Sequence, residues 1–256
     1  MIVIKSDKEI AVMREAGRIV ATLLLALQEQ IRPGVTTGEL DRKAAEVLKQ
    51  HKATSPFYNY PNHERGRRPF PGQICTSVNE ELVHGVPGKR VLKEGDIIKI
   101  DCGATYKGWI ADSAWTFPVG KISPAAKRLL EVTEGALYAA IGAALPGKRT
   151  GDVAHVLQHS VESNGFNVVR EYVSHGVGRR LHEEPSWPNF GEPGKGTPLR
   201  KGMTLAVEPM VLVGSYKTKV LADQWTVAAK DGKLTAHFEH TIAITADAPE
   251  ILTKLD

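Results

Sequence analysis

Three short motifs each occur twice in this sequence, in the same order and roughly a hundred residues apart. They are PGVTTGEL from Pro33 and PGKRTGDV from Pro146, His84-Gly85-Val86 and His175-Gly176-Val177, and KEGDIIKID ending at Asp101 and RKGMTLAVE ending at Glu208. An ordered repeat constrains the fold strongly, because it indicates two units that fold alike and pack together. We therefore predict one domain over residues 1–256 whose halves, about 1–120 and 121–256, are related by a pseudo-twofold axis.

The economical architecture for such a repeat is an α+β fold, in which the sheets of the two halves fuse into one curved antiparallel sheet with helices on its outer face. A capping box at Ser6 should open a helix that ends at Pro33, and a second helix should begin near Thr37. A helix pair is expected between Ser123 and Asn164. Strands are expected in residues 74–88, 98–120, 166–173, 199–214 and 233–247. Residues 55–73 should form an irregular stretch with a long loop, and residues 174–196 are a Gly/Pro-rich segment.

The predicted hairpin at residues 98–120 carries two acids that strands seldom bury, Asp101 and Asp112. Its turn at Lys107-Gly108 supplies the φ > 0 position that a two-residue loop needs. Such a loop places Asp101 opposite Ala114, so Asp112 lies on the same face, diagonally across the two strands. Two buried carboxylates need a positive partner between them. The alternative is a solvated acid pair on an edge hairpin.

The repeat should bring further acids to the same place. Asp101 and Glu208 end equivalent strands and should face each other across the axis, while Asp112 and Glu239 each lie one strand later. Four buried acids at one point would not stay ionised without cations, and bridging carboxylates suit two metal ions about 3.5–4 Å apart. With His175 added, the oxygen-rich set favours Mn, Fe, Co or Zn. Taken singly, each has a structural alternative: Asp112 as a turn acid, Glu208 as a residue that closes a strand, and Glu239 as part of a solvated strand face.

Two more histidines stand in loop-like contexts at the ends of strands, His84 in HGVPG and His182 in RRLHEEP. His84 is the repeat partner of His175, which should bring it near the axis. An imidazole beside a metal pair can donate a proton to a developing oxyanion or a leaving amine. The alternative interpretation of both residues is ordinary polar surface.

The composition is that of an ordinary globular chain, with a formal net charge of +4 and two cysteines. This charge is compatible with an anionic partner such as RNA without indicating one. Cys75 and Cys102 have no paired spacing, which argues against a disulfide framework and a zinc finger. The charged N-terminal stretch argues against a signal peptide, and no apolar run is long enough to span a bilayer. The expected location is the reducing cytoplasm.

Five longer motifs carry a family resemblance. They are SVNEELVHGVPG, IDCGATYKGWIADSAWTF, SHGVGRRLHEEP, LAVEPM and FEHTIAIT. Through them the chain resembles type I methionine aminopeptidase, a metallopeptidase of the pita-bread fold, from the first predicted helix to about Thr245. The resemblance implies a catalytic domain that removes N-terminal methionine from nascent proteins when the second residue is small, by two-metal activation of a bridging water.

The resemblance also implies a metal role for five positions. Asp101 would chelate one ion, Asp112 and Glu239 would bridge both ions, and His175 and Glu208 would complete the other site. The implied cofactors are two divalent ions per chain, drawn from Co, Mn, Fe and Zn.

Catalytic and substrate-binding roles are implied in the same way. Glu208 is the implied general base, His84 would meet the scissile amide nitrogen, and His182 would polarise the carbonyl. The implied methionine pocket is lined by Phe70, Cys75, Leu181 and Trp225. A chain that begins Met-Ile is expected to keep Met1, because isoleucine is not small.

The expected partner is the N-terminal methionine of a nascent chain, with no membrane or DNA contact and a monomeric protein. The basic loop at residues 62–72, with Arg65, Arg67 and Arg68, would allow transient ribosome contact, or it is merely solvated. The rival functions are a proline-directed pita-bread peptidase and a non-catalytic peptide- or RNA-binding module. The chain length disfavours the first, which usually carries an additional N-terminal domain, and the filled ligand positions disfavour the second.

Overall fold

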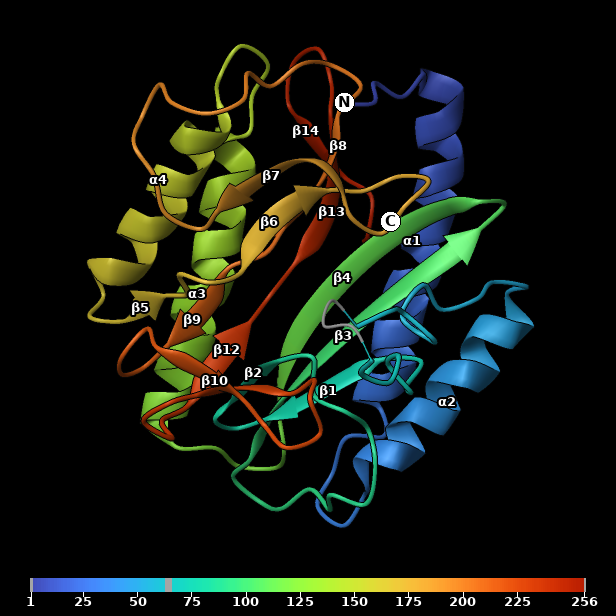
Figure 1. The fold of residues 1–256 in the computed structure, drawn as a ribbon, viewed down its shortest axis with the longest axis vertical. Coiled ribbons are helices and arrows are strands. Elements are labelled where there is room, and N and C mark those ends of the chain that lie inside the picture. Colours follow the sequence, from blue (N-terminus) through green and yellow to red (C-terminus); the bar gives the residue numbers. More distant parts are fainter. Residues whose placement is uncertain (1, 63–65, 256) are drawn as a thin grey trace.

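The computed structural model describes residues 2–62 and 66–255, so the predictions on Met1 and on Arg65 concern residues outside this range. The helices are α1 (Asp7–Gln28), α2 (Thr37–Gln50), α3 (Pro124–Ala143) and α4 (Thr150–Glu162). The strands are β1 (Cys75–Val78), β2 (Glu81–Val83), β3 (Ile97–Tyr106), β4 (Trp109–Pro118), β5 (Asn167–Val168), β6 (Val173–Gly176), β7 (Glu183–Pro188), β8 (Thr204–Val207), β9 (Met210–Leu212), β10 (Thr218–Val220), β11 (Val227–Ala229), β12 (Thr235–His237), β13 (His240–Ile244) and β14 (Pro249–Ile251). Figure 1 shows the pair α1–α2 on one side of the molecule and the pair α3–α4 on the other.

The repeated Thr-Gly motif starts the second helix of each pair. The hydroxyl of Thr37, at the start of α2, accepts a hydrogen bond from the backbone of Gly88 at 2.9 Å. The hydroxyl of Thr150, at the start of α4, accepts one from the backbone of Thr197 at 3.0 Å. The two copies of the motif therefore dock their helices on loops in the same way, as the predicted pseudo-twofold relation requires.

The strands form four sheets in the described part of the chain, in the orders β1-β3-β4, β10-β11-β2, β12-β9-β5 and β14-β13-β8-β6-β7. The halves meet where β4 runs beside β12 and β13 (Figure 1). The hydroxyl of Thr241 exchanges two hydrogen bonds with the backbone of Asp112, at 2.9 and 2.7 Å. Thr116 does the same with the backbone of His237, at 2.7 and 3.0 Å. Hydroxyl groups thus link the two halves into one curved layer.

Alternation along the strands separates the core from the opposite face of this layer. Ile100 of β3 packs in the apolar cluster beneath α1 and α2, so Asp101 faces away from these helices. Val207 of β8 packs in the cluster beneath α3 and α4, so Glu208 faces away from them. Both acids therefore point to the side of the layer that lies opposite the four described helices.

The predicted hairpin register is confirmed, since Asp101 pairs with Ala114 and β3 and β4 are joined at Lys107-Gly108. The prediction that Asp101 ends its strand is wrong, because β3 continues to Tyr106. The first helix ends at Gln28 rather than at Pro33, since the backbone already closes into a tighter turn there, with Gln30 donating to Leu27.

Other boundaries differ because long-range pairing overrides local composition. Residues 166–173 are not one strand, as only β5 and the first residue of β6 fall within them. Residues 174–196, for which the sequence indicated only a Gly/Pro-rich segment, contain most of β6 and all of β7. The prolines of β7 are tolerated because it is an edge strand. Residues 199–214 and 233–247 each form two strands separated by a break, at Glu208-Pro209 and before His240. No helix in residues 2–62 and 66–255 is both long and apolar enough to cross a membrane.

Candidate metal centre

A cavity of about 740 Å³ opens on the face of the layer that the helices leave bare. Side chains from both halves of the chain line it. The lining includes every residue that the sequence predicted for the site: Phe70, Cys75, His84, Asp101, Asp112, His175, Leu181, His182, Glu208, Trp225 and Glu239. The fold therefore gathers these residues, which lie up to 169 positions apart in the sequence, into one place.

Four carboxylates meet in this cavity. Asp101 and Asp112 come from β3 and β4, while Glu208 and Glu239 occupy the two strand breaks between β8 and β9 and between β12 and β13. Burial raises the pKa of Asp101 to about 7. Burial, with the repulsion of neighbouring acids, raises the pKa of the other three well above the usual range. Among the described residues, only imidazoles lie within ion-pair distance of these acids.

His175 of β6 adds an imidazole to the cluster. Its Nδ1 lies 2.9 Å from the carbonyl oxygen of Gly176, and its Nε2 lies 3.3 Å from Oε1 of Glu208. Burial lowers the pKa of His175 to about 3, so the ring is neutral. When the Nδ1–H donates to the Gly176 carbonyl, the lone pair of Nε2 faces the carboxylates, which is the form that binds a metal.

The unpaired atoms of the cluster fit a divalent cation. One oxygen each of Asp101, Asp112 and Glu239 is buried without a hydrogen-bond partner in the described part of the chain. Such burial is costly unless a cation satisfies the oxygens. Ligand atoms of Asp112, His175 and Glu239 lie within 4.8 Å of one another, and so do those of Glu208, His237 and Glu239. The mixed oxygen and nitrogen donors suit a transition metal or zinc.

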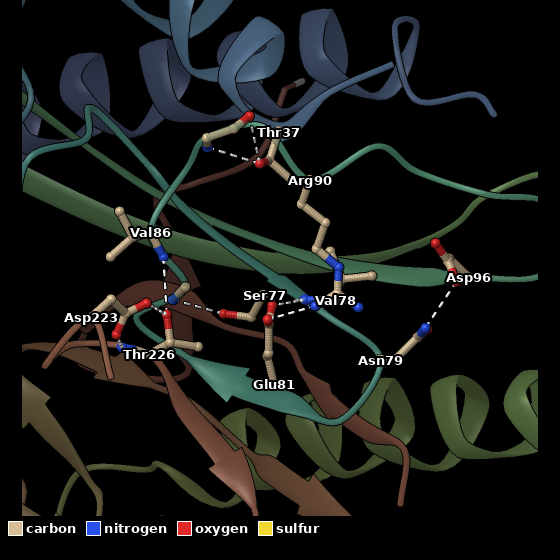
Figure 2. A network of polar contacts seen from close by, with 12 residues as sticks. Thr37, Ser77, Val78, Asn79, Glu81, Val86, Arg90, Asp96, Asp223 and Thr226 are labelled. Carbon is tan, nitrogen blue, oxygen red and sulfur yellow. Dashed lines mark hydrogen bonds and ion pairs between the residues drawn. The ribbon is translucent and has the colours of Figure 1, made fainter. Parts of the chain in front are cut away.

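His84 is held beside the cluster by a strained backbone. Its φ is +58°, in the left-handed region that residues other than glycine seldom adopt. Figure 2 shows the polar network around this turn. The backbone N–H of Gly85 donates to the hydroxyl of Ser77 at 3.0 Å, and that of Val86 donates to the hydroxyl of Thr226 at 3.2 Å (Figure 2). These bonds fix the backbone of the two residues that follow His84.

His182 also lines the cavity, in contact with the ring of His175. Its Nδ1 lies 2.7 Å from the hydroxyl of Tyr60, and its ring meets that of His175 edge to face, with 4.4 Å between the ring centroids. When Tyr60 donates to Nδ1, the neutral ring carries its proton on Nε2. His182 then presents a donor that the Tyr60 hydroxyl has oriented.

An apolar wall adjoins the polar cluster. Phe70 and Trp225 pack edge to face with centroids 5.3 Å apart, and Cys75 and Leu181 belong to the same buried cluster. The indole N–H of Trp225 donates to the backbone carbonyl of Arg68 at 3.0 Å. Part of the predicted basic loop therefore packs at the cavity rather than lying fully solvated.

Among the lining residues that were not predicted for the site, two have polar side chains near the predicted ones. His237 and Tyr172 both border the cavity. The alternation of a strand contained a signal for His237, because it stands two positions before Glu239 within the predicted strand 233–247. Tyr172, whose ring packs edge to face on that of His84, stands in a stretch whose expected strand did not form. Its position could not be deduced from local pattern.

Comparisons with known proteins agree with this chemistry. The model of metallopeptidase family M24 matches residues 11–246. Methionine aminopeptidase 1 of Bacillus subtilis is 53% identical over 255 residues, and the methionine aminopeptidase of Clostridium perfringens is 48% identical over 255 residues, each match covering 100% of both chains. The crystal structure of methionine aminopeptidase from Thermotoga maritima superposes on this chain with a TM-score of 0.95. The two sequences are 47% identical, and the match covers 100% of both chains. The expected pita-bread fold is confirmed, and the chain belongs to metallopeptidase family M24 and, within it, to the methionine aminopeptidases.

Proposed function

We propose that the chain is a methionyl aminopeptidase, a hydrolase that removes the N-terminal methionine of a polypeptide when the second residue is small. The observation that carries the proposal is the convergence of four buried carboxylates and a neutral imidazole beside an apolar wall in one open cavity. The full-length similarity to methionine aminopeptidases supports the same activity. The catalytic unit is proposed to be a single domain over residues 1–256.

The proposed cofactor is a pair of divalent ions held by Asp101, Asp112, His175, Glu208 and Glu239, drawn from Co, Mn, Fe and Zn. Such ions, when bound, supply Lewis acidity and ionise water near neutral pH. The unpaired buried oxygens of three of these residues support this assignment. A free α-amine is itself a metal ligand, which is consistent with a strict requirement for a chain terminus.

The chain's own residues would orient the substrate and move protons. Glu208 would accept a proton as general base, since its carboxylate lies at the edge of the ligand cluster against His175. His84 would donate to the scissile amide nitrogen as it leaves, and the strained turn would keep the ring aimed at that point. His182, oriented by Tyr60, would donate to the carbonyl oxygen as negative charge develops on it.

The apolar wall would bind the methionine side chain. Phe70, Cys75, Leu181 and Trp225 offer carbon and sulfur surface, which suits an unbranched thioether. The wall lies next to the acids, so a bound side chain would place the first peptide bond near Glu208. A polar N-terminal side chain would not cover this apolar surface, so such a substrate should bind less well.

The test begins with chelator-treated protein and a Met-Ala-Ser peptide. Release of methionine should return on addition of Mn, Co, Fe or Zn, each tried separately, and should stay absent in Asp101→Ala. Release from an Xaa-Pro peptide instead would assign the chain to proline-directed peptidases. Failure with every metal and both substrates would contradict peptidase activity and favour a binding module.

We also propose that the protein works as a cytoplasmic monomer on nascent chains, in transient contact with the ribosome and with neither membrane nor DNA. The basic loop would make this contact, and its Arg67 is among the residues that line the cavity. Ribosome binding should weaken with salt and fall in a triple variant of Arg65, Arg67 and Arg68 to Ala. Unchanged binding in that variant would remove the loop from the proposal.

A further inference from the structure

His237 is an imidazole buried in the cavity without an assigned role. It ends β12, and only 1% of its surface is exposed. Its backbone is held on both sides by the hydroxyl of Thr116. Neither ring nitrogen has a hydrogen-bond partner among the described residues. An imidazole buried this deeply is costly unless its nitrogens interact with something, so the ring is available to a ligand in the cavity.

The ring nitrogen of His237 faces the same carboxylate as His175 does. Nε2 of His237 lies 3.6 Å from Oε2 of Glu208, while Nε2 of His175 lies 3.3 Å from Oε1. A separation of 3.6 Å is too long for a direct hydrogen bond. The two oxygens of Glu208 therefore lie between two imidazoles. The His237 ring is too far from Glu208 for a hydrogen bond between them to satisfy its Nε2.

Two sets of ligand atoms can be drawn in this cluster. Asp112, His175 and Glu239 form one set, and Glu208, His237 and Glu239 form the other, with all atoms of a set within 4.8 Å of one another. The sets share Glu239, so they describe two neighbouring points, each surrounded by carboxylate oxygens and one imidazole. Such mixed sets suit the same transition metals at both points.

We propose that His237 is a ligand of the metal centre, supplying a second imidazole to an ion held with Glu208 and Glu239. This inference rests on the two-ion centre proposed above and extends its ligand set by one residue. It makes the centre richer in nitrogen than the five residues found by resemblance. Co(II) and Zn(II), which accept imidazole readily, should gain more from it than Mn(II) does.

X-ray absorption of the full chain, loaded with two Co(II) ions after chelator treatment, tests the proposal without an activity assay. Imidazole scattering should average about one ring per ion in the wild type and fall to about half in His237→Gln. Calorimetric titration of the same proteins should show one Co(II) ion bound at least about tenfold more weakly in the variant. His240→Gln is the matched control, because it removes another buried imidazole, whose Nδ1 lies 2.8 Å from the hydroxyl of Thr253.

Unchanged imidazole scattering in His237→Gln would overturn the proposal, even if binding weakened, because His237 would then only position Glu208. Wild-type scattering of a single ring for two ions would overturn it too, and this measurement needs no variant to fold. Failure of the centre itself is distinguishable, since the wild type would then bind Co(II) no better than Asp112→Ala. Thermal unfolding of each metal-free variant checks that the substitutions leave the fold intact.

Discussion

The ammonium of Lys5 lies 2.7 Å from the carboxylate of Glu183, and both side chains are buried. The same carboxylate accepts hydrogen bonds from the backbone N–H groups of Arg179 and Arg180, at 2.7 and 3.1 Å. A side chain near the N-terminus thereby holds the turn that leads to His182 on the opposite half of the molecule. This ion pair connects the first residues of the chain to the geometry of the site.

Replacing Lys5 with Met should lower the free energy of unfolding by about 3–5 kcal/mol, because Glu183 is then buried without its partner. Urea unfolding of the metal-free protein measures the loss. Arg14→Met is the control, since it breaks a half-exposed pair with Glu250 and should cost less than about 1 kcal/mol. Equal losses in the two variants would contradict the buried role of Lys5.

The contribution of Glu183 should depend on pH. Burial alone raises the pKa of Glu183, but hydrogen bonds from Lys5 and from the backbone outweigh burial and bring the pKa below its ordinary value of 4.5. The stabilisation is therefore complete above the unfolded value and is lost as the pH falls through the folded one. Glu183→Gln should cost clearly more stability at about pH 7 than at about pH 3. A cost that does not change between these two pH values would argue against the ion pair as its source.

Substitutions in the hairpin turn that sets the register of Asp101 and Asp112 should change the stability of the protein in both directions. Lys107 has φ +48° and Gly108 has φ +74°, and asparagine adopts the first conformation more readily than lysine does. Lys107→Asn should raise the free energy of unfolding by about 0.5 kcal/mol. Gly108→Ala should lower it, since a Cβ there would lie 2.9 Å from Nη1 of Arg179 in a conformation that already disfavours side chains. Thermal unfolding measures both changes, and the stability should rise in Lys107→Asn and fall in Gly108→Ala.

The network in Figure 2 should matter for catalysis through His84. Thr226 accepts a hydrogen bond from the backbone N–H of Val86 and is itself held by Asp223. Thr226→Val therefore removes the partner of this partly buried N–H and loosens the turn. We expect kcat for Met-Ala-Ser to fall about tenfold with KM nearly unchanged, because the aim of His84 matters most in the transition state. Thr226→Ser keeps the hydroxyl and should restore kcat. A variant pair with equal kcat values would exclude this positioning effect.

Removal of metal should expose the mutual repulsion of the four acids. In chelator-treated protein at about pH 8, Asp112→Asn should be more stable than the wild type, since it removes one of the crowded carboxylates. Addition of Co(II) at about a hundred times its dissociation constant should stabilise the wild type by about 2.7 kcal/mol and the variant by much less. Calorimetric melting with and without Co(II) checks the reversal. The same order of stability under both conditions would contradict a metal role for Asp112.

Local sequence chemistry determined a large part of this protein. The Lys107-Gly108 turn and the two-residue alternation of strands sufficed to pair Asp101 with Ala114. The capping box at Ser6 located the start of α1, and the start of α2 was expected near Thr37, whereas the start of α4 at Thr150 was not predicted. The repeat then indicated which acids would converge, because equivalent strands in symmetric halves end up facing each other. The family resemblance added the roles of individual residues, which are still proposals.

Tertiary structure alone decided the features that depend on partners far away in the chain. The Lys5–Glu183 pair joins residues 178 positions apart, and no local pattern links them. The strand breaks at Glu208 and Glu239, which aim both acids into the cavity, lie where β8 and β9 run beside β12 and β13. The orientation of His237 toward Glu208 follows from those breaks. Turns and caps are settled by neighbouring residues, whereas strand partners and buried charges are settled only when the whole core closes, so the sequence determined the former and the fold the latter.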